Sequence, residues 1–423
     1  MKIIKNILFC ILFCVFAISC SGGKEGSLVG SVGSVLPDWQ EGYLDIHSIN
    51  TGRGESTLYI FPDGTTMLVD ASSSLIPADH PIPPVDAKPN ASAVSGETIT
   101  NYVSHFVKAA SNKLNYIMVT HWHPDHIGGF STSLPQHSSG KFLLNGITTI
   151  GANIRFDKII DRGYTYPGNL SSYTDVAGIP NYIDFVEWSQ TEYSAEREEF
   201  ISGVTDQITL KQNPSGYDNF CIRNIIGNGL LWTGEGTQTR NLFPENHDEL
   251  EAAKPPENIF SLGFHLKYGK FDYFAGGDLQ HNNRSTHAWF DVESPVADVM
   301  QRVEVLKANH HATSNCHSDV FINKLKPDAV VVTVWRDPQP NPETIKRIFD
   351  ANSDCHIFLT NITDANKERL NSHTPDITSK FKSLNGHVVV RVAPGGDSYY
   401  IYVLDDTNEE YIVSEIFGPY QCN

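Results

Sequence analysis

Residues 120–129 constrain the chain most, because three histidines and an aspartate fall within six consecutive positions. The segment reads Thr-His-Trp-His-Pro-Asp-His-Ile-Gly-Gly and follows an apolar run at residues 116–119. That run contains β-branched residues and predicts a short buried strand. Pro124 favours the first turn of a helix, so the polar side chains are expected in a strand-to-helix turn.

The residue types in this turn predict a metal site. In extended backbone His121 and His123 point to one face, while Asp125 and His126 come round the turn from the other side. A lone histidine is most often an ordinary surface or core residue, but packing gives no reason to gather four ligand-type side chains. Imidazole and carboxylate donors suit Zn²⁺ first and Mn²⁺ or Fe second. Two neighbouring ions can share such a cluster.

The order His121-x-His123-x-Asp125-His126 resembles the signature of the metallo-β-lactamase fold superfamily, and Gly128 and Gly129 match its usual continuation. The resemblance implies an α/β fold, a four-layer αββα sandwich. It also implies a hydrolase with a dinuclear zinc centre, where a hydroxide held between the ions attacks the substrate.

Later segments resemble the remaining motifs of this superfamily. Asp70 closes the apolar run at 66–69 and resembles an aspartate that supports the metal loop from behind. Asp278 follows two glycines and resembles the carboxylate that bridges the two metals; a turn-capping aspartate is the alternative. Of the pair after the predicted strand 303–306, we expect His311 to bind metal and His310 to lie beside it or face the substrate. The expected metal ligands are His121, His123, Asp125, His126, Asp278 and His311, with Asp125 and His310 as catalytic residues.

Superfamily members usually have a third histidine ligand in the interval before Asp278. His137 and His247 are the candidates in this chain. Neither lies in a recognisable motif, so an ordinary surface histidine is the favoured interpretation of each.

The order of predicted elements is that of an α/β domain. Expected strands at 43–49, 58–61 and 66–69 precede a helix at 97–110 and then the metal strand. Strand, crossover helix and parallel strand place ligands at the carboxyl ends of the strands.

The rest of the chain is less regular. We expect a hydrolase domain over residues 43–410, with an insertion at about 150–255 and a C-terminal tail at 411–423. Within the insertion, residues 182–188 and 191–200 are expected to be helical and 220–226 a strand. Later elements are expected at 271–275, 329–334, 341–348, 356–359, 388–392 and 399–404.

Residues 1–20 have the features of a secretion signal. Lys2 and Lys5 precede an apolar stretch at 7–18 that is short for a membrane span. The junction Ser19-Cys20 resembles a bacterial lipoprotein signal, in which Cys20 carries the lipid (palmitate), and residues 21–42 then form a flexible spacer. The alternative is an ordinary cleaved signal. Either places the protein in the bacterial envelope, where the remaining cysteines can form disulfides: Cys221, Cys316, Cys355 and Cys422.

The formal net charge of -18 bears on the substrate. An acidic surface without a Lys/Arg cluster repels long polyanions, which disfavours extended duplex DNA as a partner. A small anion can still be held by metals, since their charge dominates locally. We therefore expect a small-molecule or short-chain substrate.

From residues 52–55 to 341–342 the motif order resembles the soluble hydrolase domain of bacterial competence DNA-uptake proteins. The chain departs from it in its full His121/His123 pair, its central insertion and its lack of the multi-span membrane portion. The resemblance favours phosphoester or phosphodiester hydrolysis. Lactone, thioester or β-lactam hydrolysis on the same centre, or a non-catalytic metal-braced binding protein, are the alternatives.

Overall fold

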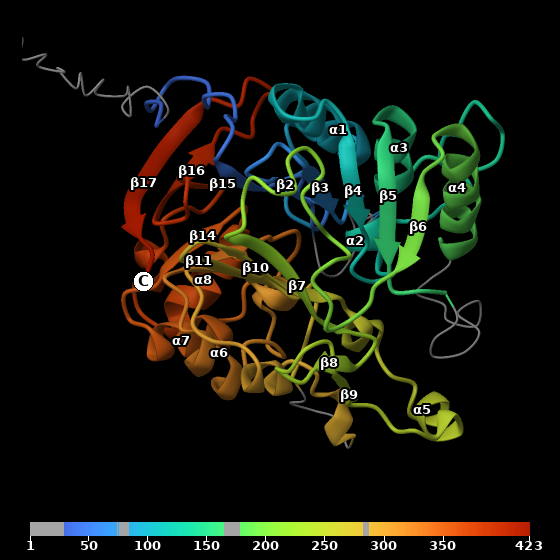
Figure 1. Ribbon diagram of the computed structural model, residues 1–423. Coiled ribbons are helices and arrows are strands. Elements are labelled where there is room, and N and C mark those ends of the chain that lie inside the picture. Colours follow the sequence, from blue (N-terminus) through green and yellow to red (C-terminus); the bar gives the residue numbers. More distant parts are fainter. Residues whose placement is uncertain (1–28, 74, 76–83, 165–177, 282–286) are drawn as a thin grey trace, which may run out of the picture.

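The computed structural model describes residues 29–73, 75, 84–164, 178–281 and 287–423. Two large sheets lie face to face, with helices α1, α3 and α4 outside one and α6, α7 and α8 outside the other (Figure 1). The predicted four-layer αββα sandwich is therefore confirmed. Cys20 and the rest of the predicted signal lie outside the described residues.

The first sheet has nine strands in the order β17-β16-β15-β1-β2-β3-β4-β5-β6. β1 to β3 form an antiparallel meander, whereas β3, β4, β5 and β6 run parallel. The bounds are β1 Leu44–Ser48, β2 Thr57–Ile60, β3 Thr66–Val69, β4 Leu114–Met118, β5 Phe156–Asp161, β6 Glu196–Glu199, β15 His387–Val392, β16 Ser398–Leu404 and β17 Val413–Gln421.

The second sheet has eight strands in the order β14-β13-β12-β11-β10-β7-β8-β9. β11 to β14 are parallel, so their carboxyl ends meet at one edge. The bounds are β7 Phe220–Gly227, β8 Leu230–Trp232, β9 Thr239–Asn241, β10 Gly263–Tyr268, β11 Phe271–Ala275, β12 Val305–Lys307, β13 Ala329–Val332 and β14 His356–Leu359.

The helices follow the βαβ order that the sequence predicts. In the first half, α1 covers β3 and β4 and its apolar residues Ile99 and Val103 are fully buried. In the second half, α6 and α7 cover β12 and β13. The bounds are α1 Ser95–Phe106, α2 Pro124–Ile127, α3 Gly146–Asn153, α4 Ile179–Glu192, α5 His247–Ala253, α6 Asp319–Leu325, α7 Pro342–Ala351 and α8 Asp364–His373.

A third apolar core lies between the two sheets. Tyr59 from the first sheet and Tyr273 from the second meet there, with their hydroxyls 3.0 Å apart. Because most strands are covered on both faces, they are near-continuous apolar runs, which is why the sequence reveals them. The three apolar cores together hold the strand ends that carry the site.

Two expectations about the middle of the chain differ from the structure. Residues 193–200 are not helical: α4 ends at Glu192, and β6 pairs in parallel with β5, where Arg197 Nη2 lies 2.6 Å from Asp161 Oδ1. The expected insertion at 150–255 is largely part of the sandwich, since it supplies β5, β6 and β7. It also supplies β8 and β9 at the edge of the second sheet, and the helix α5.

Both expected flanking segments pack on the domain. Residues 413–421, expected as a tail, form β17 on the edge of the first sheet. In the expected spacer, Leu36 and Trp39 are buried in the first core and Val35 forms a bridge with Ile412. The four cysteines outside the signal, Cys221, Cys316, Cys355 and Cys422, are free thiols.

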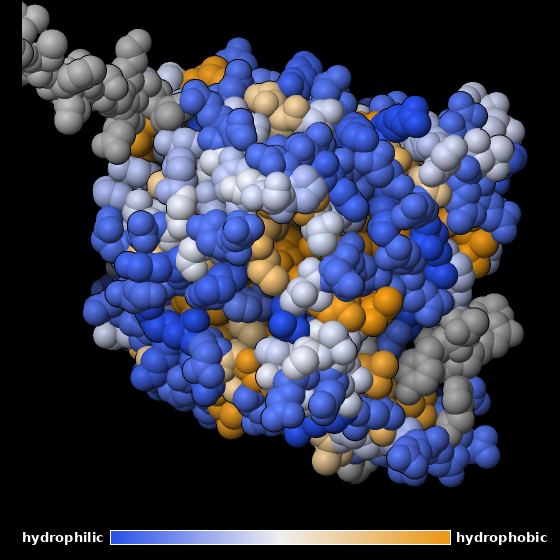
Figure 2. Space-filling view, in the orientation of Figure 1, coloured by the Kyte–Doolittle hydropathy of each residue, from blue (hydrophilic) through white to orange (hydrophobic). Residues whose placement is uncertain are grey.

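The described surface is mainly hydrophilic, with small separate apolar patches on the face shown in Figure 2. Among the described residues, none of the helices combines the length and apolar character that spanning a bilayer requires.

Candidate metal centre

Four strand ends supply the candidate site. Asp70 follows β3, the histidine-rich turn with α2 follows β4, Asp278 follows β11, and the His310–His311 pair follows β12. The structure brings these segments together although they are far apart in the sequence. The potential ligands form two groups, which lie on different sides of Asp278 and both include it.

The first group consists of His121, His123 and Asp278. Nε2 of His121 lies 3.1 Å from Nδ1 of His123 and 3.8 Å from Oδ2 of Asp278. His121 is fully buried, and burial lowers its pKa well below the ordinary histidine value. His121 is therefore neutral, which is the state that binds a metal.

The second group contains His126, His311 and Asp278, with Asp125 beside them. Oδ1 of Asp278 lies 3.2 Å from Nε2 of His126 and 3.6 Å from Nε2 of His311. Nε2 of His311 lies 3.1 Å from Oδ2 of Asp125. One carboxylate oxygen of Asp278 thus faces each group.

Glu55 also belongs to the second group, and the sequence analysis assigned it no role. Its Oε2 forms a short buried ion pair with the ammonium of Lys307. Since Lys307 lies at the end of β12, the pair fixes the turn after β1 against the strand that leads to His310. Glu55 is therefore held by a cation of the protein itself.

Unsatisfied atoms show that the residues fit a metal. Nε2 of His126 and Oδ1 of Asp278 are buried, yet neither makes a hydrogen bond of acceptable geometry with any described residue. Burial alone would lower the pKa of His126, but the carboxylates of Asp278, Asp70 and Asp125 outweigh it and raise that pKa well above the ordinary value. So much buried negative charge calls for cations, and imidazole and carboxylate donors are those of Zn²⁺ and related divalent ions.

Neighbouring groups orient the ligands. Oδ2 of Asp70 accepts from Nδ1 of His126 at 2.7 Å, and its Oδ1 accepts from the backbone N–H of Thr120 at 2.8 Å. Nδ1 of His311 lies 2.8 Å from the carbonyl of Thr333. Each contact places the proton on Nδ1 and leaves Nε2 free to face the site. Asp70 therefore has the supporting position that the sequence predicts.

A buried ion pair, absent from the sequence analysis, supports the first group. Arg162 and Glu257 form a two-bonded pair, with Nε–Oε1 at 2.6 Å and Nη2–Oε2 at 2.7 Å. The same Oε1 accepts from the backbone N–H of Trp122 at 2.9 Å. The residue between His121 and His123 is thus fixed to the segment that begins at Glu257.

The His310–His311 turn has unusual backbone geometry. His310, His311 and Ala312 have φ of 45°, 52° and 54°, a region that side chains other than glycine rarely occupy. Such strain collects where function requires it and is held by surrounding contacts. Glu293 provides them: its carboxylate accepts from Asn309 Nδ2 and from the backbone N–H groups of His317 and Ser318, at 2.8–2.9 Å.

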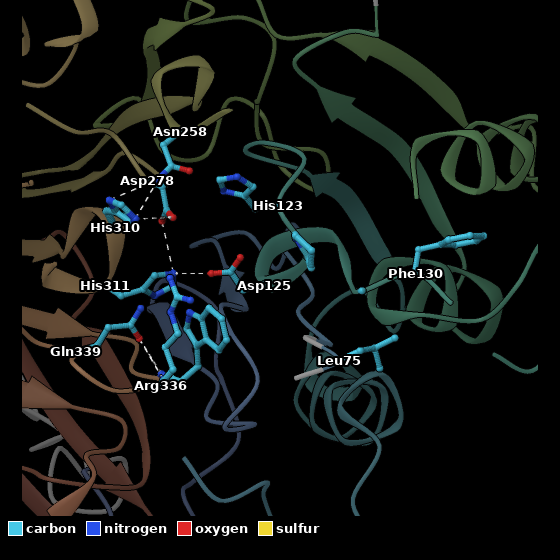
Figure 3. A pocket seen from close by; sticks show the side chains of 13 residues that line it. Leu75, His123, Asp125, Phe130, Asn258, Asp278, His310, His311, Arg336 and Gln339 are labelled. Atoms are coloured by element: carbon cyan, nitrogen blue, oxygen red, sulfur yellow. Dashed lines mark hydrogen bonds and ion pairs between the residues drawn. The ribbon is translucent and has the colours of Figure 1, made fainter. Parts of the chain in front are cut away.

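An open pocket of about 630 Å³ leads to the centre (Figure 3). The two ligand groups form one end, and Arg336 lies beside His311 with its guanidinium 4.6 Å from the ring of Trp335. No acidic side chain in the described part of the chain forms an ion pair with Arg336. The residues that line the pocket are Leu75, His123, Pro124, Asp125, Gly129, Phe130, Asn258, Asp278, His310, His311, Trp335, Arg336 and Gln339.

Neither of the two candidates for the third histidine ligand, His137 and His247, belongs to a segment that lines the pocket. His137 stacks on Phe142 with ring centroids 4.5 Å apart and bonds Ser139, away from the lining residues. His247 starts α5, which lies at the periphery, far from α2 (Figure 1). Asn258 does line the pocket, and the sequence analysis assigned it no role.

Comparisons with known proteins agree on the type of fold. The profile of the Metallo-beta-lactamase superfamily matches residues 50–198, which include the whole histidine-rich turn. No curated protein matches the sequence.

Solved structures also resemble the chain, among them the following three. A protein described as a metal-dependent hydrolase from Parabacteroides distasonis is 13% identical over 75% of this chain and 92% of that one, with a TM-score of 0.33. An isothiocyanate hydrolase from Delia radicum gut bacteria is 11% identical over 81% and 95%, with a TM-score of 0.35. A metallo hydrolase from the archaeon Ignicoccus hospitalis is 11% identical over 82% and 98%, with a TM-score of 0.32. Superposition this loose supports no assignment of individual residues or substrates.

Proposed function

Since the chain belongs to the metallo-β-lactamase superfamily and is a metallohydrolase, we propose that it holds two divalent ions, zinc foremost, and hydrolyses small phosphodiesters. The observation that carries the proposal is the position of Asp278. Its Oδ1 faces His126 and His311, while its Oδ2 faces His121. A carboxylate with one oxygen toward each group can bind both ions, whereas a histidine nitrogen serves only one.

The ions supply one part of the chemistry: they make a nucleophile from water near neutral pH and stabilise negative charge on the substrate. The protein positions the ions and binds the substrate. Asp125 and His311 lie on the pocket side of the second group. Burial lowers the pKa of His310 to about 4, so His310 is neutral at pH 7 and its N–H can donate a hydrogen bond to the substrate.

The pocket suits a small anionic substrate. Arg336 supplies a cation near the ligand groups, and guanidinium is well matched to phosphate oxygens. The net charge of -18 disfavours a long polyanion, so a mononucleotide-sized or short phosphodiester is the proposed substrate.

Acyl substrates are the second candidate, and a different part of the pocket favours them. Leu75 and Phe130 lie at the end of the pocket away from Arg336, as Figure 3 shows. Together they give an apolar wall that an acyl chain of a lactone or thioester can cover.

The test combines metal analysis with turnover. We expect purified protein to contain two ions per chain and to hydrolyse bis-p-nitrophenyl phosphate, with activity lost on chelation and recovered on adding Zn²⁺ or Mn²⁺. His126→Ala is expected to abolish turnover, whereas His265→Ala, which removes a histidine paired with Asp272 outside the site, is not. Turnover of lactones or thioesters alone would favour the acyl candidate. Full metal content without turnover of any substrate would indicate a binding protein.

We also propose export and lipid attachment at Cys20, supported by the apolar stretch and the Ser19-Cys20 junction. Cys20→Ala is expected to abolish palmitate labelling and to release the protein from the membrane fraction. Cys10→Ala, within the same leader, should change neither. Membrane fractionation of Cys20→Ala equal to that of the parent would contradict the proposal.

A further inference from the structure

We infer that the side-chain oxygen of Asn258 is the remaining protein ligand at the His121/His123 position, where a third histidine is expected. This inference rests on the proposed two-metal function and adds to it an unequal pair of metal positions. Three independent features of Asn258 support it: the state of its oxygen, the partner of its nitrogen and the fixation of its backbone.

The oxygen of Asn258 is buried and has no hydrogen-bond partner among the described residues. Leaving a buried amide oxygen unpaired costs about 1–3 kcal/mol, so such an atom in a pocket calls for an explanation. In Figure 3 this oxygen points toward His123, across the space that Asp278 also borders. Amide oxygens are ordinary ligands of divalent cations.

The nitrogen of Asn258 accounts for the orientation of the amide. Nδ2 lies 2.9 Å from Nε2 of His310. An amide NH₂ can only donate, so Nε2 of His310 accepts this hydrogen bond and the proton of the ring sits on Nδ1. Because Nδ2 of Asn258 is hydrogen-bonded to His310, its Oδ1 points to the opposite side, where His121 and His123 lie.

The backbone of Asn258 is fixed relative to the same two histidines. Glu257, its neighbour, accepts from the backbone N–H of Trp122 at 2.9 Å and is itself held by Arg162. Trp122 lies between His121 and His123, so a single bridge sets the distance from Asn258 to both ligands.

The consequence is a difference between the two positions. The first would have two imidazole nitrogens and two oxygens, from Asp278 and Asn258, while the second has two imidazole nitrogens with the carboxylates of Asp125 and Asp278. A neutral amide is a weaker donor than a carboxylate or an imidazole toward Zn²⁺. The first position should therefore lose its ion more readily than the second.

Two substitutions of matched size test the inference on the full-length protein. Asn258→Leu removes the oxygen, and we expect retained Zn²⁺ to fall from two ions to one per chain after dialysis against a graded series of chelator. Asn258→Asp replaces the amide with a carboxylate, and we expect it to keep both ions at about tenfold more chelator than the parent tolerates. Elemental analysis measures both outcomes without reference to any substrate.

His137→Ala is the matched control, since His137 is a third-histidine candidate with a described side chain. It should retain metal as the parent does. Equal retention in Asn258→Leu and the parent, or loss of one ion in His137→Ala, would overturn the inference. Thermal unfolding of the metal-stripped proteins separates loss of a ligand from loss of the fold: the expected result is a melting temperature for Asn258→Leu close to the parental one. A parent that holds two unequal ions but turns over no substrate would refute the proposed function and leave this assignment standing.

Discussion

Replacing Asp70 with asparagine should weaken metal binding through the tautomer of His126. Each carboxylate oxygen of Asp70 meets a donor: Oδ1 the backbone N–H of Thr120 at 2.8 Å, and Oδ2 the Nδ1 of His126 at 2.7 Å. An asparagine has one acceptor oxygen and one NH₂ group. Whichever way the amide is turned, one of the two donors then faces an NH₂.

The magnitude follows from these contacts. If the NH₂ faces His126, the ring avoids the clash by moving its proton to Nε2, which is the atom that must be unprotonated to bind metal. If it faces Thr120, a buried N–H is left unpaired at a cost of about 1–3 kcal/mol. Loss of a supporting partner typically weakens metal binding 10- to 100-fold. We therefore expect Zn²⁺ affinity at the His126/His311 position to fall about 10- to 100-fold, or roughly 1.4–2.7 kcal/mol.

The assay is competition between the protein and a chromogenic chelator, with the melting temperature of the metal-free protein measured in parallel. Asp63→Asn is the matched control, because Asp63 also accepts backbone N–H groups with both oxygens, from Thr65, Gln212 and Asn213 at 2.8–2.9 Å. It lies at the opposite end of β3 from Asp70. Asp63→Asn should destabilise the fold without changing metal affinity. Parental Zn²⁺ affinity in Asp70→Asn would refute the tautomer argument.

Three further predictions concern the site and its surroundings. Asp278→Asn should lose one ion per chain and lower kcat/KM by several orders of magnitude, because an amide offers one good metal-binding oxygen where two are needed; Asp272→Asn, within the preceding strand β11, should do neither. Arg336→Met should raise KM for an anionic substrate about tenfold or more while leaving kcat and the KM of a neutral ester nearly unchanged. Burial raises the pKa of Glu293 from 4.5 to about 7, so the folded state binds the extra proton and stability should fall by up to about 3 kcal/mol as pH rises from 4.5 to 7. Glu293→Gln should flatten that pH dependence of urea unfolding, and an unchanged slope would show that Glu293 does not cause it.

The structure brings the predicted ligand residues together because each follows a strand that is buried on both faces. The apolar runs before Asp70, His121, Asp278 and His310 mark strand ends, and parallel strands bring their carboxyl ends to one edge. Local patterning therefore suffices to place these side chains together. β6 fails for the opposite reason: Glu196–Glu199 has no apolar alternation, and its strand conformation depends on pairing with β5.

What the sequence does not predict is the set of contacts that no local pattern encodes. Arg162 follows β5 of the first sheet and Glu257 precedes β10 of the second, so the pair forms between segments far apart in the sequence, and neither residue lies in a motif. The same holds for Glu55 and Lys307, which become a buried pair through packing of the turn after β1 on β12. A search for a third ligand among histidines alone looks to His137 and His247, whereas the structure presents an asparagine. The pair Arg162–Glu257 fixes the position of this asparagine. The proposed ligand is therefore placed by tertiary contacts, and a search restricted to histidine does not find it.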